Sequence, residues 1–207
     1  MFSLLLRGFL LGLAVAASPG PIFFLCFRRT LAQGRPIGLA SGLGVATADG
    51  FYAAIATFGV AALTSAFIAG RRPLAVIGGV VLIVLGARIL MDRRQTAAGT
   101  PPAVTARSLA WAYGSTLGLT ITNPATIVSF AALAATLGFA TGGYAVGPAL
   151  VVLGVLLGSA TWWCILVVGA SLLRSRVTPT VVEWISTVSG LAIAVLGILA
   201  VISAFSG

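Results

Sequence analysis

The sequence predicts an all-α integral membrane protein with six transmembrane helices in a single transmembrane domain over residues 1–207. Of its 207 residues, 59 % are hydrophobic and only 7 % are charged. The apolar residues also form runs close to the roughly 20 residues that an α-helix needs to cross a bilayer. A soluble domain of this size lacks the polar residues to cover so much apolar surface. We therefore expect the lipid bilayer to be the partner of most of the chain.

Six runs are long and apolar enough to span a membrane. In chain order they cover residues 4–26, 37–63, 74–91, 109–137, 144–173 and 181–205. The fourth and fifth are longer than a minimal span, which predicts tilted or interrupted helices.

A polar segment divides the six runs into two groups of three. Residues 92–108 contain Arg93, Arg94 and the pair Pro101-Pro102, a composition typical of a linker. We therefore expect a first three-helix repeat over residues 1–91, a cytoplasmic linker over 92–108 and a second repeat over 109–207.

The two halves share a short sequence pattern. Residues 8–13 read Gly-Phe-Leu-Leu-Gly-Leu and residues 114–119 read Gly-Ser-Thr-Leu-Gly-Leu, and each copy is followed by a proline, in Ser18-Pro19 and in Asn123-Pro124. Two glycine-rich membrane helices can share such a pattern by chance, but the proline after each copy favours a repeat. A repeat of three spans inserts in opposite directions in its two copies. Inverted repeats are typical of secondary transporters, whose substrate sites lie at interrupted helices near the bilayer midplane.

The arginines predict the orientation. The chain has a net charge of +9, and its basic residues are all arginines scattered between apolar runs, which argues against a nucleic-acid partner. The loops after spans one, three and five hold Arg28, Arg29, Arg35, Arg93, Arg94, Arg107, Arg174 and Arg176, whereas the other side has Arg7, Arg71 and Arg72. Short arginine-rich loops stay cytoplasmic. We therefore expect a multi-pass membrane protein with both termini outside the cytoplasm.

Among the acidic residues, Asp49 is the one whose position most strongly predicts a function. Asp92 is expected as a loop charge and Glu183 at the start of the last span, whereas Asp49 lies near the middle of the run 37–63. An ionised carboxylate at that depth costs roughly 2.5 to 3.5 kcal/mol on insertion scales, so it needs a partner, water or a proton. Asp49 is therefore a candidate site for a proton and for the ammonium group of a substrate. The alternative is a structural hydrogen bond to a neighbouring helix.

Two predicted helix breaks lie at the depth of Asp49. Prolines interrupt a helix, and Ser18-Pro19-Gly20-Pro21 and Asn123-Pro124 place them inside the first and fourth runs. In a membrane, freed backbone groups are tolerated where they line a cavity. A half-helix that starts near Gly20 presents free N–H groups and the positive end of its dipole, which suits a substrate carboxylate. The alternative is that both prolines are structural kinks.

The composition excludes several chemistries. The chain has no histidine, and its cysteines, Cys26 and Cys164, do not form a Cys-x-x-Cys pair, so no metal site or cofactor is expected. No nucleophile–base pair stands out, so we do not expect an enzyme. Two alternatives to a transporter of zwitterions stay open, namely a membrane thiol-disulfide electron carrier that uses Cys26 and Cys164, and a metal-ion exporter.

Glycines and aromatic residues have structural interpretations. Glycines four residues apart, at Gly34, Gly38 and Gly42 and at Gly154 and Gly158, predict close helix approach and allow a homodimer. The aromatic residues Trp111, Trp162, Trp163, Trp184 and Tyr113 are expected as interfacial anchors, with the alternative that Trp162 or Trp163 lies deeper and lines the chamber.

Taken together, these motifs resemble the LysE/RhtB family of bacterial amino-acid exporters, known as LysE-type translocators. The resemblance rests on the residues Pro19-Gly20-Pro21, Arg28-Arg29, Gly34, Gly38, Gly42, Gly44, Asp49, Gly59-Val60-Ala61-Ala62-Leu63 and Asn123-Pro124. It implies a six-helix inner-membrane protein that exports amino acids or related small zwitterions at the expense of the proton motive force. It also implies functional roles for the proline motifs and for Asp49. The chain departs from many relatives in having Ala125 in place of a lysine and no aromatic residue at positions 78–86, so the substrate can differ.

Overall fold

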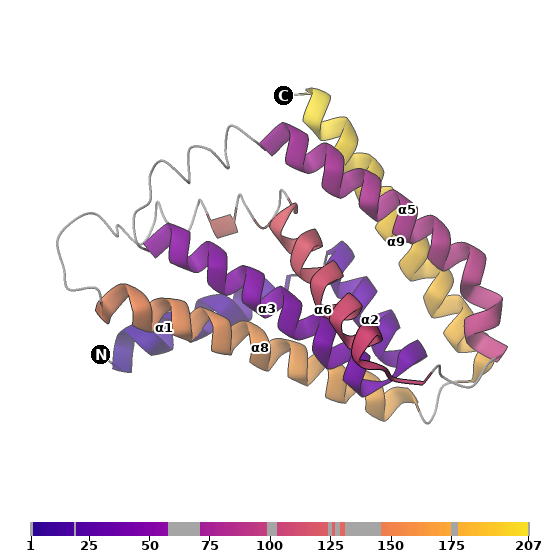
Figure 1. Ribbon diagram of the computed structural model, residues 1–207, viewed down its shortest axis with the longest axis horizontal. Helices are drawn as coiled ribbons and strands as arrows, with labels where there is room; N and C mark the ends of the chain where they lie inside the picture. The colour runs from indigo at the N-terminus through magenta and orange to yellow at the C-terminus, as the bar shows by residue number, and fades with distance from the viewer. Residues whose placement is uncertain are drawn as a thin grey trace.

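The computed structural model describes residues 2–18, 20–57, 71–98, 103–123, 126, 129–130, 146–174 and 178–206. Within these ranges the chain is helical and contains no strand, which confirms the all-α class for the described part (Figure 1). The helices are α1 (Phe2–Ala16), α2 (Pro21–Gln33), α3 (Arg35–Thr57), α5 (Arg71–Ala98), α6 (Ala106–Ile121), α8 (Val146–Arg174) and α9 (Pro179–Ser206).

Four of the described helices are long and apolar enough to cross a membrane, namely α3, α5, α8 and α9. A fifth span is obtained if α1 and α2 count as one broken helix. The helix α6 covers only the first half of the predicted run 109–137, because most of the second half lies outside the described residues. A multi-pass membrane protein is therefore established, whereas the complete set of six spans in two inverted repeats stays a prediction.

Helices α8 and α9 begin and end within two residues of the predicted runs 144–173 and 181–205. Helix α5 is longer than its predicted run, because it continues past Met91 to Ala98. The first part of the predicted linker 92–108 is therefore helical. Its proline pair, Pro101-Pro102, lies outside the described residues.

The predicted break in the first run is present in the structure. Helix α1 ends at Ala16 and α2 begins at Pro21, and the two helix axes differ by 81°. Proline at the first helical position fits an N-terminus, because its missing N–H would have no acceptor within the helix. Pro19 itself lies outside the described residues, as do Pro124 and Ala125.

The prediction of a loop around Arg28 and Arg29 is wrong. Helix α2 continues to Gln33, and a single residue, Gly34, separates it from α3. Gly34 has φ 96°, in the left-handed region that glycine adopts at little cost. This glycine forms a helix cap, in which its N–H donates to the carbonyl of Thr30, and so its role is the turn rather than close helix approach.

Glycines bring several helices into backbone contact. A Cβ atom on Gly12 would lie 2.1 Å from the carbonyl oxygen of Val155 in α8, and one on Gly158 would lie 2.0 Å from that of Phe9 in α1. Gly79 and Gly197 meet in the same way between α5 and α9. The close approach predicted for the glycine pair of α8 is therefore confirmed, and α1 packs along α8 while α5 packs along α9 (Figure 1).

Helix α3 joins the other elements because it packs against both α6 and α8. Gly44 faces the backbone of Tyr113 in α6, and Gly42 faces Trp163 in α8. In the predicted inverted repeat, α1 corresponds to α6 and α3 corresponds to α8. The contact of α1 with α8 would then be equivalent to the contact of α6 with α3. The break between α1 and α2, the middle of α3 and the end of α6 meet beside α8, and this is where the candidate site lies.

Candidate functional site

A cavity of about 110 Å³ lies where these elements meet. Five of the seven predicted site residues line it, namely Ser18, Gly20, Pro21, Asp49 and Asn123. The remaining two, Pro19 and Pro124, lie outside the described residues. The structure thus brings together residues that the sequence separates by more than a hundred positions.

Asp49 is buried in the middle of α3 and contributes to the wall of this cavity. Its side chain is only 2 % exposed. The hydroxyl of Ser159 on α8 donates a hydrogen bond of 2.7 Å to Asp49 Oδ2. This bond between α3 and α8 is the contact expected if Asp49 has only a structural role. A carboxylate can accept several hydrogen bonds, however, and the position of Asp49 on the cavity wall gives it access to a ligand.

At the first break, the first turn of α2 forms part of the wall of the same cavity. Gly20, Pro21, Ile22 and Phe23 all line it. Gly20 has extended backbone and makes no side-chain cap. The N–H groups in the first turn of a helix have no acceptor within the helix and carry the positive end of its dipole. This end of α2 therefore favours a negatively charged or hydrogen-bond-accepting group.

At the second predicted break, the carboxyl end of α6 borders the cavity. Thr122 caps this helix and donates its N–H to the carbonyl of Gly118, and the N–H of Asn123 donates to the carbonyl of Thr120 at 3.2 Å. Thr120, Asn123, Thr126 and Ser129 line the cavity. These residues supply hydroxyl and amide groups to the cavity wall, which suit a small polar ligand.

Tyr52 is a residue that the sequence analysis missed. It lies almost one turn after Asp49 on α3, and its hydroxyl donates a hydrogen bond to the carbonyl of Ile121 at the end of α6. A helix leaves its last carbonyls without partners, so Tyr52 satisfies one of them and fixes the second break against α3. A tyrosine in an apolar span, three residues after the membrane aspartate, was the signal available in the sequence.

Arg29 was assigned to a cytoplasmic loop, and the structure corrects this. The side chain is 6 % exposed. Its guanidinium donates to Ser41 Oγ on α3 at 3.1 Å, to the carbonyl of Ala112 on α6 at 3.2 Å and to Ser115 Oγ on α6 at 2.9 Å. We call this set of contacts the Arg29 junction. It joins α2, α3 and α6 and is not part of the cavity wall.

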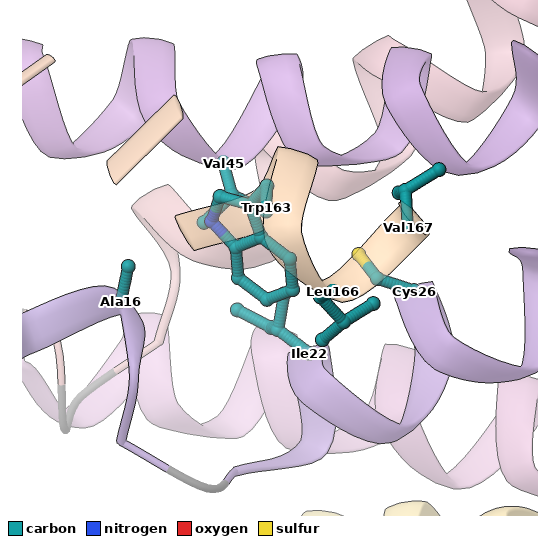
Figure 2. Close-up of a cluster of buried hydrophobic side chains, with 7 residues drawn as sticks. All are labelled: Ala16, Ile22, Cys26, Val45, Trp163, Leu166 and Val167. Atoms are coloured by element: carbon teal, nitrogen blue, oxygen red, sulfur yellow. The ribbon is translucent and has the colours of Figure 1, made fainter. Parts of the chain in front are cut away.

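Trp163 corrects the expectation that the tryptophans are interfacial anchors. It is 3 % exposed, and its ring lies in a buried cluster with Ala16, Ile22 and Val45 (Figure 2). It also lines the cavity, as the alternative in the sequence analysis proposed. Trp111 and Trp184 are 66 % and 67 % exposed, as anchors facing lipid would be.

The described residues also bear on the two other functions. Cys26 is fully buried and Cys164 is exposed, and both are free thiols. This difference in environment argues against a thiol pair. Among the described residues, no group of three or more histidine, cysteine, aspartate or glutamate side chains is close enough to hold a metal ion.

A comparison with protein families supports the resemblance seen in the motifs. The family model described as LysE type translocator matches residues 13–204. This range includes both helix breaks, Asp49 and Trp163. No curated protein and no solved structure matches the chain.

Proposed function

Because the chain belongs to the LysE type translocator family, we propose that it exports an amino acid or a related small zwitterion from the cytoplasm. Members of this family are transporters and not enzymes. The family does not identify the substrate or the driving force. The proposal for both therefore depends on the chemistry of the cavity.

One observation carries the proposal, namely that a buried carboxylate shares a small cavity with the beginning of a helix. Asp49 suits the ammonium group of a zwitterion, and the first turn of α2 suits its carboxylate. Ser18, Thr120 and Asn123 add neutral hydrogen-bonding groups. Such a wall favours a ligand that carries both charges, because each charge of the ligand then meets a complementary group.

Asp49 also supports coupling to protons. An ionised carboxylate without a counter-charge is unfavourable inside a membrane, so Asp49 is stable either when protonated or when it pairs with an ammonium group. The two states exclude one another. A transporter with this property releases substrate outside, binds a proton there and returns to the cytoplasmic side, where the proton leaves. The result is antiport of substrate and protons, driven by the proton motive force.

We place the protein in the bacterial inner membrane with both termini outside the cytoplasm. Arg28 and Arg29 are buried in α2 and no longer count as loop charges. The other arginines on the predicted cytoplasmic side, Arg35, Arg93, Arg94, Arg107, Arg174 and Arg176, still outnumber Arg7, Arg71 and Arg72. The glycines that suggested a homodimer make contacts within the chain, since Gly42 faces Trp163 and Gly158 faces α1, so the homodimer stays a prediction without support from this structure.

Transport by the purified protein in liposomes tests the function. Vesicles loaded with each radiolabelled amino acid in turn, under an imposed pH gradient, should show efflux of one or a few of them. Asp49→Asn should lower proton-driven efflux by about a hundredfold, since a loss of roughly 2.7 kcal/mol of charge interaction corresponds to two factors of ten. Glu183→Gln is the matched control, because Glu183 is a carboxylate at the start of α9 that does not line this cavity.

Exchange of labelled for unlabelled substrate without a pH gradient separates the two roles of Asp49. If Asp49 binds the ammonium group, Asp49→Asn loses exchange as well as net efflux. If it binds only the proton, exchange survives in the variant. Full proton-driven efflux by Asp49→Asn would contradict the assignment of this residue.

A further inference from the structure

The indole N–H of Trp163 is a buried donor that the protein leaves without an acceptor. Its nitrogen is inaccessible to solvent and makes no hydrogen bond within the described part of the chain. Buried polar groups in native proteins are almost always paired, so an exception calls for an explanation. An aromatic ring without a polar atom, such as that of phenylalanine, would avoid the penalty of an unpaired N–H group. Trp162 shares this unpaired nitrogen, so what distinguishes Trp163 is that it also lines the cavity.

The position of Trp163 shows where a partner for its nitrogen would be. The residue lines the same cavity as Asp49. It lies four residues after Ser159 on α8, the residue that donates to Asp49. Four residues of α-helix correspond to about 6 Å along the axis. Figure 2 shows the nitrogen-bearing edge of the ring on the side where Ala16 lies, and Ala16 also lines the cavity.

We propose that Trp163 orients the substrate by donating its indole N–H to the carboxylate of an amino acid whose ammonium group is bound at Asp49. This inference rests on the proposed function, because it assigns a ligand contact within the same site. One helical turn separates Ser159, which donates to Asp49, from Trp163, so the two side chains lie on the same face of α8. The carboxylate would then lie between the indole and the beginning of α2, where Ile22 packs in the same buried cluster as Trp163.

The ring of Trp163 also limits the size of the substrate. The cavity of about 110 Å³ has an apolar wall made by Trp163, Ile22, Phe23 and Val45. The ring has little freedom to move away, because a Cβ atom on Gly42 of α3 would be only 2.5 Å from Trp163 Cβ. The substrate class that fits is an α-amino acid with a small, uncharged side chain.

Trp163→Phe is the direct test, with Trp162→Phe as the matched control. Trp162 is the neighbouring residue, its indole nitrogen is likewise buried without an acceptor, and it does not line this cavity. The ligands are the transported amino acid and the amine that lacks its carboxylate. Equilibrium binding of the radiolabelled compounds to the full-length protein in detergent gives the Kd of each.

Trp163→Phe should raise the ratio of the Kd of the amino acid to the Kd of the amine about tenfold, because only the amino acid loses a hydrogen bond to a charged group. Trp162→Phe should change neither value. Trp163→His keeps an N–H donor and should bind the amino acid more tightly than Trp163→Phe. An unchanged ratio of the two Kd values in Trp163→Phe overturns the inference, as does an equal effect of Trp162→Phe.

A measurement on the wild-type chain avoids any dependence on how the variants fold. With ¹⁵N-labelled tryptophan, the indole N–H resonance of Trp163 should move on addition of the amino acid, whereas that of Trp162 should not. A stationary Trp163 resonance at saturating substrate overturns the inference. If the wild type transports substrate and Asp49→Asn does not, while Trp163→Phe binds normally, then only the role of Trp163 is wrong. If the wild type transports no amino acid, the proposed function itself fails.

Discussion

The Arg29 junction and the cavity at Asp49 are two regions in which the protein buries an ionisable side chain. They differ in how many hydrogen bonds that side chain makes. Arg29 is 6 % exposed and Asp49 is 2 % exposed. Three neutral oxygen atoms from α3 and α6 accept hydrogen bonds from Arg29. Asp49 accepts one hydrogen bond from Ser159 and otherwise borders a cavity. Burial of a charge therefore does not identify a ligand site, whereas a charge beside an open space does.

The two regions are also connected. Ser41 of the Arg29 junction and Asp49 are eight residues apart on α3, which is about 12 Å along the helix. Helix α6 contributes Ala112 and Ser115 to the junction and Thr120 to the cavity wall. The Arg29 junction thus holds together, two turns away, the helices that form the cavity. The comparison predicts that substitutions at the junction lower stability, whereas substitutions of polar groups at the cavity lower transport.

The largest effect on stability is expected for Arg29→Ala. It removes three hydrogen bonds from a charged donor and leaves space between three helices, so the free energy of unfolding should fall by about 3 kcal/mol. Reversible unfolding in mixed micelles measures this. Arg35→Ala is the control, because Arg35 is exposed at the start of α3. Equal stability of the two variants would show that the Arg29 junction is not structural.

Gly42→Ala tests whether the apolar side of the cavity is as tightly packed as the Arg29 junction. The new Cβ atom would be 2.5 Å from Trp163 Cβ, so α3 and α8 have to separate. We expect a loss of about 2 kcal/mol, typical of overpacking, together with weaker substrate binding. Gly118→Ala is the control, since nothing lies within 4 Å of the added atom. A helical glycine with free space should gain about 0.5 kcal/mol or more on this change.

Thr116→Val measures a neutral hydrogen bond beside the Arg29 junction. Thr116 is fully buried, and its hydroxyl lies 2.7 Å from the carbonyl oxygen of Ser41 and 3.0 Å from that of Ala112. Valine has nearly the same shape, so only the hydrogen bond is lost. The free energy of unfolding should therefore fall by about 1 kcal/mol. Thr161→Val serves as the control because its hydroxyl bonds only within α8, to Leu157. If Thr116→Val lowered the free energy of unfolding as much as Arg29→Ala, the charged hydrogen bonds of Arg29 would stabilise the protein no more than a neutral one.

The smallest effect on stability is expected for Asp49→Asn. The side-chain carbonyl of asparagine can still accept from Ser159, so the free energy of unfolding should change by no more than about 0.5 kcal/mol. Transport should nevertheless be lost. A variant that unfolds as readily as Arg29→Ala would instead make Asp49 a structural residue and remove the contrast between the two regions.

The sequence predicted the features that depend on local chemistry. The long apolar runs of α8 and α9, the interruption before Pro21 and the isolation of Asp49 all follow from propensity and hydropathy. The convergence of Ser18, Gly20, Asp49 and Asn123 was also predicted, because residues at similar depth in a bundle lie close together.

The features that depend on distant partners were not predictable. Arginines near the end of an apolar run are ordinarily loop residues, and the acceptors of Arg29 on α6 are 83 and 86 positions away. Trp163 lies inside a long helix whose depth in the membrane the sequence does not define. Its unpaired nitrogen becomes visible only when every neighbouring acceptor is placed. The continuation of α5 beyond Met91 likewise could not be read from polarity, since a helix can leave the membrane without ending.

The single-residue connection at Gly34 has a mechanical consequence. Helix α2 is 13 residues long and therefore about 20 Å from end to end. It is fixed to α3 at its last residue, while its first turn forms part of the cavity wall. A tilt of about 10° about Gly34 would displace that first turn by about 3.5 Å, more than the diameter of a water molecule, while the covalent link itself hardly moves. Helix α2 is thus joined to α3 through a single glycine at one end, while its other end carries the backbone donors that face the cavity.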